Sequence, residues 1–204
     1  MSRYLGPRLR KIRSLGVALP GLSRKQPGKR TGSPGEQGTM RRRRRMSTYR
    51  LQLAEKQKIR FNYGLSERQL HNVFQEAARM PGETGVNMLQ LLERRLDSVV
   101  ARAGFAPTIP AARQLVSHGH VTVNGRKVNI ASARVRVGDV VSLREKSRNL
   151  KSVEDQLIQG SGMGVPSFLE VDAHERRIRV ASLPAREDVA LDVQERMVVE
   201  FYSR

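Results

Sequence analysis

The sequence predicts a mixed fold, with helices in its first part and short antiparallel strands after them. As far as Val116, apolar residues recur at the three- and four-residue spacing of amphipathic helices. The period then changes to two around Asn124-Gly125, at Val121, Val123, Val128 and Ile130. Because both turn residues tolerate the positive φ angles of a type I′ turn, this pair is the strongest short hairpin signal in the chain.

Net charge is the main constraint on what the chain binds. The 204 residues carry +19, of which residues 1–63, with 18 basic and 2 acidic residues, supply +16. Residues 94–151 add +9, whereas residues 64–93 and 152–204 carry −2 and −4. Such asymmetry points to a nucleic acid or an anionic membrane. No apolar run approaches the ~20 residues of a membrane span, so we expect RNA and no membrane.

Residues 1–46 are predicted to form a basic arm that is rich in Gly, Pro and Ser and ends in the arginine run 41–45. Alone in water the arm is too poor in apolar residues to offset its ordering entropy, so we expect it to order on RNA or to be held by the segments that it contacts. A disordered solubilising tail is the alternative. The five consecutive arginines favour an RNA-binding arm over a solubilising tail, because the guanidinium group matches the geometry of phosphate. The N-terminus lacks the apolar region of a secretory signal, although it is Arg-rich and poor in acids like a transit peptide.

Three helices are predicted between residues 47 and 103. Ser47 caps the first, which runs to about residue 62, and the capping box Ser66–Gln69 starts the second. Pro81-Gly82 ends the second helix, and the third runs over 87–103. We interpret the apolar faces of the second and third helices as core, at Leu70, Val73, Phe74, Ala77, Ala78, Met88, Leu91, Leu92, Leu96, Val99 and Val100.

Shorter elements follow. Thr108-Ile109-Pro110 opens a helix that Gly119 ends, since proline at the first helical position loses no hydrogen bond. The hairpin and a strand over 135–143, with a turn at 138–139, come next. The rest is predicted as a linker with a short helix at 147–165, strands at 168–171 and 178–181, and an acidic amphipathic helix at 192–202.

Several residues invite a catalytic or metal-binding interpretation. His118 and His120 have no third ligand nearby in sequence, so a metal is not expected, and turn packing or RNA contact is favoured. The segment GSGMG lacks the Lys-Ser/Thr of a phosphate-binding loop and is predicted to be a loop. Tyr63 stacks on a base or is buried at its helix end, and both alternatives stay open. The chain has no cysteine, which excludes disulfides and fits a reducing compartment.

The central region resembles the RNA-binding domain named after small-subunit ribosomal protein four. The motifs that carry the resemblance are Arg95-Leu96-Asp97, Arg102-Ala103-Gly104, residues 112–116, Gly119-His120-Val121 and Val123-Asn124-Gly125. The opening MSRYLGPRLRKIRSLG, the block EKQKIRFNYG and the ending VEFYSR extend the resemblance to the whole ribosomal protein four family, near its cyanobacterial or plastid members. Many bacterial relatives carry a four-cysteine zinc site near the N-terminus, which this chain lacks, so no cofactor or metal is expected.

The resemblance implies an α+β architecture in two parts. An all-helical domain of residues 47–93, completed by about 184–204, follows the arm, and residues 94–183 form an inserted RNA-binding module of two helices and an antiparallel sheet. It also implies a structural, non-enzymatic constituent of the small ribosomal subunit, in a bacterial cytoplasm or a plastid or other organelle. Its partners would be small-subunit rRNA, ribosomal protein five and neighbouring proteins, near the path by which mRNA enters.

The implied role is primary rRNA binding that nucleates assembly of the subunit body and contributes to translational accuracy. The alternatives are an RNA-modifying enzyme or a stress factor that uses the same module. An enzyme needs a further domain of ~100 residues or more, and the Arg95-Leu96-Asp97 triplet, which echoes the catalytic aspartate motif of pseudouridine synthases, is expected to be an ion pair. The residues expected to contact RNA are Arg3, Arg8, Arg10, Lys11, Arg13, Arg41, Arg42, Arg43, Arg44, Arg45, Lys56, Lys58, Arg60, Tyr63, Arg95, Arg102, Arg113, Gln114, Ser117, His118, His120, Asn124, Arg126 and Lys127.

Overall fold

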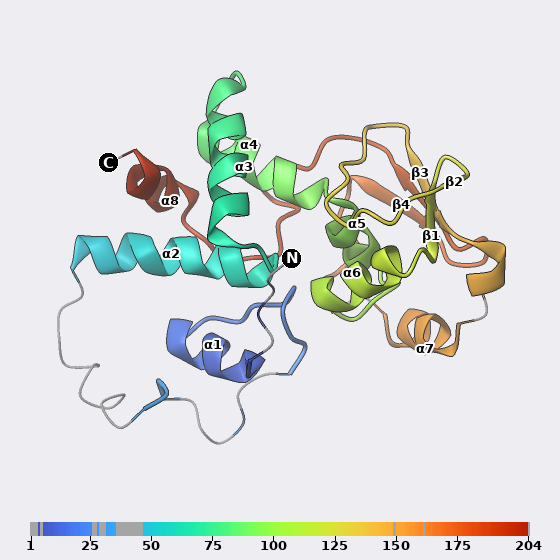
Figure 1. Ribbon diagram of the computed structural model, residues 1–204, viewed down its shortest axis with the longest axis horizontal. Helices are drawn as coiled ribbons and strands as arrows, with labels where there is room; N and C mark the ends of the chain where they lie inside the picture. Colours follow the sequence, from blue (N-terminus) through green and yellow to red (C-terminus); the bar gives the residue numbers. More distant parts are fainter. Residues whose placement is uncertain are drawn as a thin grey trace. The chain divides into compact units, whose positions relative to one another are not determined.

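The structure is a computed structural model that describes residues 4, 6–25, 28, 32–35, 47–148, 150–160 and 162–203. The contacts divide them into two units (Figure 1). The helical unit holds the described residues up to Met88 and from Leu191 onward, and the sheet unit holds those of Leu89–Ala190. Helices and one antiparallel sheet in the described residues confirm the α+β prediction. No helix among them has the length and apolarity needed to cross a bilayer.

Two helices of the helical unit, α2 and α3, start with the caps that the sequence predicts. Ser47 Oγ accepts a hydrogen bond from the Arg50 backbone N–H, and Ser66 and Gln69 form both bonds of the capping box. The apolar faces of the helices then pack together, with α8 lying mainly against α2 and also against α3. The helices of this unit are α1 (Arg8–Leu15), α2 (Thr48–Asn62), α3 (Glu67–Arg79), the first part of α4 (Thr84–Glu93) and α8 (Glu195–Tyr202).

The predicted core face of α3 is only partly confirmed. Leu70, Val73 and Ala77 are buried, whereas Phe74 is half-buried and packs its ring 4.8 Å from that of Tyr202. The prediction for Ala78 is wrong, because this residue is exposed. One position beyond Ala77 turns a side chain by about 100° around the helix, which is enough to leave a narrow buried stripe.

Of the two ways in which the arm was expected to order, residues 8–25 follow the second, because other segments of the chain hold them without RNA. Helix α1 and the turns after it bury Ile12, Leu19 and Leu22, each at most 4% exposed. The backbone N–H of Gly21 donates to Asn62 Oδ1 at 2.9 Å, which fastens the segment to the end of α2. The apolar surface that this stretch lacks for folding alone is supplied by α2. The arginine run 41–45 lies outside the described residues.

The single helix predicted over 87–103 is wrong, because the structure divides it into α4 and α5 (Leu96–Arg102). Arg95 is extended (φ −67°, ψ 141°), and the chain on both sides of it pairs with residues 131–135. The backbone N–H groups of Leu96 and Asp97 donate to carbonyls of that segment at 2.8 and 3.1 Å. These distant hydrogen bonds replace the helical ones, although every apolar residue predicted for this stripe is buried.

The sheet unit contains a five-stranded antiparallel sheet in the order β2-β1-β3-β5-β4 (Figure 1). Its buried face holds register pairs such as Val121 with Leu143 and Val141 with Ile178, and its open face carries Thr122. The elements are α5, α6 (Ile109–Ser117), β1 (Val121–Val123), β2 (Arg126–Lys127), β3 (Val140–Leu143), the 3-10 helix η3 (Glu145–Ser147), α7 (Lys151–Gln159), β4 (Leu169–Asp172) and β5 (Arg177–Val180).

The predicted turns are confirmed, but two strand predictions are too long. Strand β2 ends at Lys127, and Ile130 is 60% exposed instead of continuing the apolar alternation. Strand β3 begins at Val140, five residues later than predicted. Asp139 explains the late start, because its carboxylate accepts the backbone N–H of Arg136 at 2.7 Å and holds the chain in a turn before the strand.

The hairpin turn yields a prediction. Asn124 and Gly125 have φ values of 48° and 77°, and nothing lies within 4 Å of a Cβ placed on Gly125. Gly125→Val therefore meets no clash, but a β-branched residue resists this conformation. We expect the free energy of unfolding to fall by about 1–3 kcal/mol in urea titrations. Gly125→Asn, which tolerates positive φ, is the matched control and should lose clearly less. Equal losses would contradict the backbone explanation.

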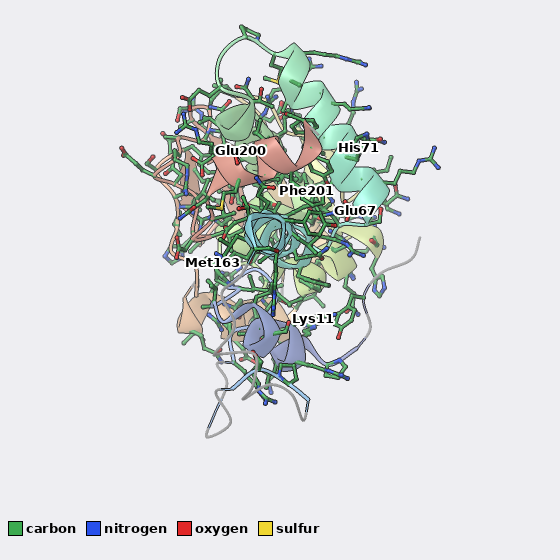
Figure 2. All side chains as sticks on the ribbon, turned by 90° about the vertical axis from the view of Figure 1, so that its left-hand side faces the viewer. Lys11, Glu67, His71, Met163, Glu200 and Phe201 are labelled. Carbon is green, nitrogen blue, oxygen red and sulfur yellow. The ribbon has the colours of Figure 1, made fainter. Side chains whose placement is uncertain are left out.

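A second prediction concerns Tyr202 at the end of α8, the neighbour in sequence of Phe201, which Figure 2 labels together with Glu67 of α3. The Tyr202 hydroxyl donates to Glu67 Oε1 at 3.0 Å, and Lys56 Nζ binds the same oxygen at 2.7 Å. Burial, and then the bond to the Glu67 carboxylate, raise the pKa of Tyr202 well above its usual value. Burial also raises the pKa of Glu67, but the bonds from Lys56 and Tyr202 outweigh it and lower that pKa.

The raised pKa makes the fold sensitive to alkali. Above about pH 10 the tyrosine of the unfolded chain ionises while folded Tyr202 keeps its proton, so the free energy of unfolding falls as pH rises. Tyr202→Phe should lower stability by about 1 kcal/mol at pH 8, because the hydrogen bond is lost. The difference from the parent chain should shrink at pH 11. Tyr49→Phe on α2 controls for the loss of a tyrosine hydroxyl. If the stability difference between Tyr202→Phe and the parent chain is the same at both pH values, the raised pKa of Tyr202 is contradicted.

Candidate nucleic-acid interface

The candidate interface in the sheet unit starts on one face of α6. Thr108 caps this helix through its hydroxyl, which accepts the Ala111 N–H, and Pro110 lies in the first turn, as predicted. Ile109, Ala112 and Val116 are buried, so the helix turns its other side outward. Four predicted RNA-contact residues share that outer side at helical spacing and are exposed or half-buried: Arg113, Gln114, Ser117 and His118.

Gly119 is the point where the helix end, the hairpin and β3 meet. Its φ is 75°, and the side chain of Lys127 crosses it so closely that a Cβ there would overlap the Lys127 chain. Arg144 donates from Nη1 to the Gly119 carbonyl at 3.4 Å and from its backbone N–H to His120 at 2.9 Å. His120 Nδ1 lies 2.9 Å from Ser147 Oγ. Three cationic or titratable side chains are thus brought to the C-terminal end of α6, where the helix dipole favours positive charge.

Asn124 holds the hairpin in place instead of presenting its amide to solvent. Its Nδ2 donates to Asp139 Oδ1 at 2.9 Å, and its Oδ1 accepts the Val140 N–H at 2.9 Å. The side chain therefore ties the turn to the start of β3. Its neighbours Arg126 and Lys127 are exposed and carry the charge of the hairpin.

Asp97 forms a buried ionic cluster beneath this surface. The carboxylate is inaccessible to solvent and accepts two bonds from Arg95 at 2.9 and 3.0 Å. It accepts two more from Arg113 at 2.9 and 2.7 Å, and one from the Ser98 N–H at 3.1 Å. Two guanidinium groups share one carboxylate, so the cluster keeps one positive charge. The arginine side chain on α6 is 19% exposed and reaches the surface, and the other is 8% exposed.

Five residues predicted to contact RNA are buried and make internal contacts. Tyr63 is 1% exposed, which decides between its two interpretations in favour of burial at the helix end. Lys56 and Lys58 bind Glu67 and Glu55 at 2.7 and 2.6 Å. Arg95 is engaged by Asp97, and Arg102 lies 3.6 Å from Glu93 and donates to the carbonyls of Met163 and Asp188. Charge in the sequence identified these residues, but long-range partners determine their exposure.

The arm residues in the described part of the chain lie on α1. Arg8 and Arg10 are exposed, and Lys11 and Arg13 are half-buried, as is Arg60 on α2. Arg3 and the run 41–45 fall outside the described residues. Other exposed cations were not predicted to contact RNA, because their only signal in the sequence is the charge excess of their region. Among them are Arg24, Lys25, Arg134, Arg136, Arg144 and Lys146.

Nothing in the described residues forms a metal site of three or more His, Cys, Asp or Glu side chains. The rings of His118 and His120 lie 6.1 Å apart. The geometry instead combines a short helix, a tight hairpin and surface cations with the buried ionic cluster of Asp97, which we call the frame. This combination defines a polyanion-binding module, since such cations can meet phosphates while the frame fixes their positions.

Comparison with known proteins agrees with that class. Residues 3–93 match the family described as Ribosomal protein S4/S9 N-terminal domain, and residues 94–141 match the S4 domain. Small ribosomal subunit protein uS4 of Synechococcus elongatus and that of Nostoc punctiforme are each 53% identical to the chain, and that of Prochlorococcus marinus is 52% identical. Each alignment covers 100% of this chain and 99% of the relative. The chain therefore belongs to the uS4 family.

The ionic cluster yields a prediction for Asp97→Asn. The substitution leaves the buried guanidinium group of Arg95 and the half-buried one of Arg113 without their carboxylate, and removing one partner of a buried pair costs about 3–5 kcal/mol. We expect a loss of that size in the free energy of unfolding, measured by urea titration. Asp155→Asn, at an exposed position on α7, is the matched control and should change stability by at most ~0.5 kcal/mol. Similar stabilities of the two variants would show that Asp97 is not the centre of the frame.

Proposed function

We propose that this chain is a structural constituent of the small ribosomal subunit and binds its rRNA. Membership of the uS4 family over the full length supports the assignment. The observation that carries the mechanism is the surface on α6 and the hairpin, where Lys127 and Arg144 converge on Gly119 and Arg113 of the same helix binds Asp97. Since the major groove of A-form RNA excludes side chains, this surface recognises backbone shape more than base identity.

The residues that we propose to contact RNA are chosen by the exposure of their side chains. In the module of residues 94–183 they are Arg113, Gln114, Ser117, His118, His120, Arg126 and Lys127, together with the exposed Arg134, Arg136 and Arg144. In the N-terminal part they are Arg3, Arg8, Arg10, Lys11, Arg13, Arg60 and the arginines at 41–45. The buried or internally bonded Lys56, Lys58, Tyr63, Arg95, Arg102 and Asn124 support the surface and do not touch RNA in this proposal.

We further propose that the chain is not an enzyme. The triplet that echoes a catalytic aspartate motif supports this view, because Asp97 is inaccessible and bound by two arginines, whereas a catalytic carboxylate must reach its substrate. As the family resemblance implies, the proposal includes nucleation of subunit assembly, contact with ribosomal protein five near the path by which mRNA enters, and a contribution to accuracy. The ribosome would be that of a bacterium or a plastid.

The test measures binding to full-length small-subunit rRNA of Synechococcus elongatus over a series of salt concentrations. Arg126→Ala/Lys127→Ala should weaken binding and reduce the slope of log K against log salt by about 2, because about one counterion is released per lysine or arginine contact. Arg177→Ala/Arg179→Ala removes the same charge from exposed positions on β5 and is the matched control. The chain should also co-sediment stoichiometrically with small subunits at high salt.

Two results would contradict the proposal. Equal effects of the two double variants would mean that net charge, and not the hairpin surface, determines affinity. Failure of the parent chain to remain on small subunits at high salt would favour the stress-factor alternative.

A further inference from the structure

Two clusters in the helical unit place cations over aromatic rings, and they differ in one respect. Near the end of α8, Lys56 Nζ lies 4.3 Å from the centre of the Phe201 ring and binds Glu67 at 2.7 Å. Figure 2 labels Phe201 and Glu67. In the second cluster, Lys11 Nζ lies 5.1 Å from the ring centre of Tyr4 and 4.7 Å from that of Phe61. Within the described residues, no carboxylate pairs with Lys11.

The second cluster is open and strongly cationic. Tyr4 is 40% exposed, and its ring meets that of Phe61 edge-on, with ring centres 5.7 Å apart and planes at 68°. Arg60 Cζ lies 5.4 Å from the Phe61 ring, and the Arg60 Nε atom is buried with no hydrogen-bond partner in the described structure. Residues 4–25 hold six basic side chains and no acidic one. An exposed ring in such a field complements a group that is both planar and anionic.

We propose that Tyr4, Lys11, Arg60 and Phe61 form a stacking site for an unpaired nucleotide of the bound RNA. The base stacks on the exposed side of the Tyr4 ring, and the lysine on α1 and the arginine on α2 face the flanking phosphates. Aromatic stacking suits any unpaired base, because every base has a π face, whereas bases inside a helix are already stacked. This inference rests on the proposed function and adds single-stranded RNA to what the helical unit recognises.

The geometry gives each residue a separate task. The Tyr4 hydroxyl donates to the Pro7 carbonyl at 3.2 Å, which limits the rotation of the ring. Phe61 supports the ring edge from α2, and Lys11, labelled in Figure 2, reaches from α1 over both rings. A cation within about 6 Å of a ring centre is attracted to the ring, so the lysine helps to hold the Tyr4 ring in place. Arg60 is also held by Gln57, whose Oε1 accepts its Nη1–H at 3.2 Å.

The experiment compares two RNA probes with the same number of phosphates. One is a ten-nucleotide oligoadenylate with 2-aminopurine at its centre, and the other has abasic sugars at its three central positions. The full-length parent chain should bind the base-containing probe on the order of tenfold more tightly at fixed salt and quench the 2-aminopurine fluorescence. Tyr4→Leu should lose both the preference and the quenching, while Tyr4→Trp should keep both.

Tyr49→Leu is the matched control, because Tyr49 is 52% exposed in the same unit and its ring lies against Phe201. It should retain the base preference. Thermal melting of each variant separates a lost ligand contact from a lost fold, and Tyr4→Leu should melt like the parent.

Three results would overturn the inference: a base preference that survives Tyr4→Leu, equal weakening of both probes, or weakening that accompanies a lower melting temperature. A neighbouring protein lost from Tyr4→Leu small subunits, with the base preference intact, would identify a protein interface instead. Subunit co-sedimentation distinguishes this failure from failure of the proposed function. If the chain stays on small subunits while Tyr4→Leu keeps its preference, only the stacking site is wrong.

Discussion

The buried carboxylate of Asp97 is the interaction on which the sheet unit depends. A carboxylate removed from water is tolerated only when its lone pairs are satisfied, and this one accepts five hydrogen bonds, four of them from two guanidinium groups. Those bonds fix the start of α5 and tie Arg113 of α6 to it, beside the segment 131–135 that interrupts the preceding helix. The outward cations keep their positions because the helices beneath them are fixed. The positions of the basic side chains on the surface thus depend on the ion pairs that the buried Asp97 carboxylate forms.

Ion pairs between acidic and basic side chains also occur elsewhere in the described part of the chain. There are 38 basic and 19 acidic residues, and several acids serve as internal partners of basic side chains: Glu55, Glu67, Glu93 and Asp97. Each neutralises a cation that would otherwise face a desolvation penalty. Most of the other basic side chains in the described part of the chain are exposed. For this reason a net charge of +19 is compatible with two folded units, although self-repulsion opposes compaction.

Local signals account for the parts of the fold that the sequence predicted. The caps at Ser47 and Ser66, the proline in the first turn of α6 and the Asn-Gly turn depend on neighbours within a few residues, so a single sequence reveals them. The break at Arg95 depends on a segment about 40 residues later, and the folding of α1 depends on Asn62 at the end of α2. The candidate site divides in the same way. The outer residues of α6 and the hairpin followed from periodicity and charge, whereas Lys56, Arg102 and Tyr63 were misassigned because burial is set by distant partners.

The two clusters that place a lysine over aromatic rings differ in whether a carboxylate pairs with that lysine. On α2, Lys56 and Phe61 are five positions apart, and each belongs to a cluster in which a lysine lies over aromatic rings. Glu67 sits beside the first lysine, so that lysine is neutralised and the cluster fastens α8 to α2 and α3. The second cluster lies among the cations of α1, and no acid in the described residues neutralises its lysine. Its positive charge is therefore available to a phosphate, and its exposed ring to a base. Because Glu67 pairs with Lys56, the first cluster joins helices inside the fold. The second cluster has no such glutamate in the described residues and is suited to RNA.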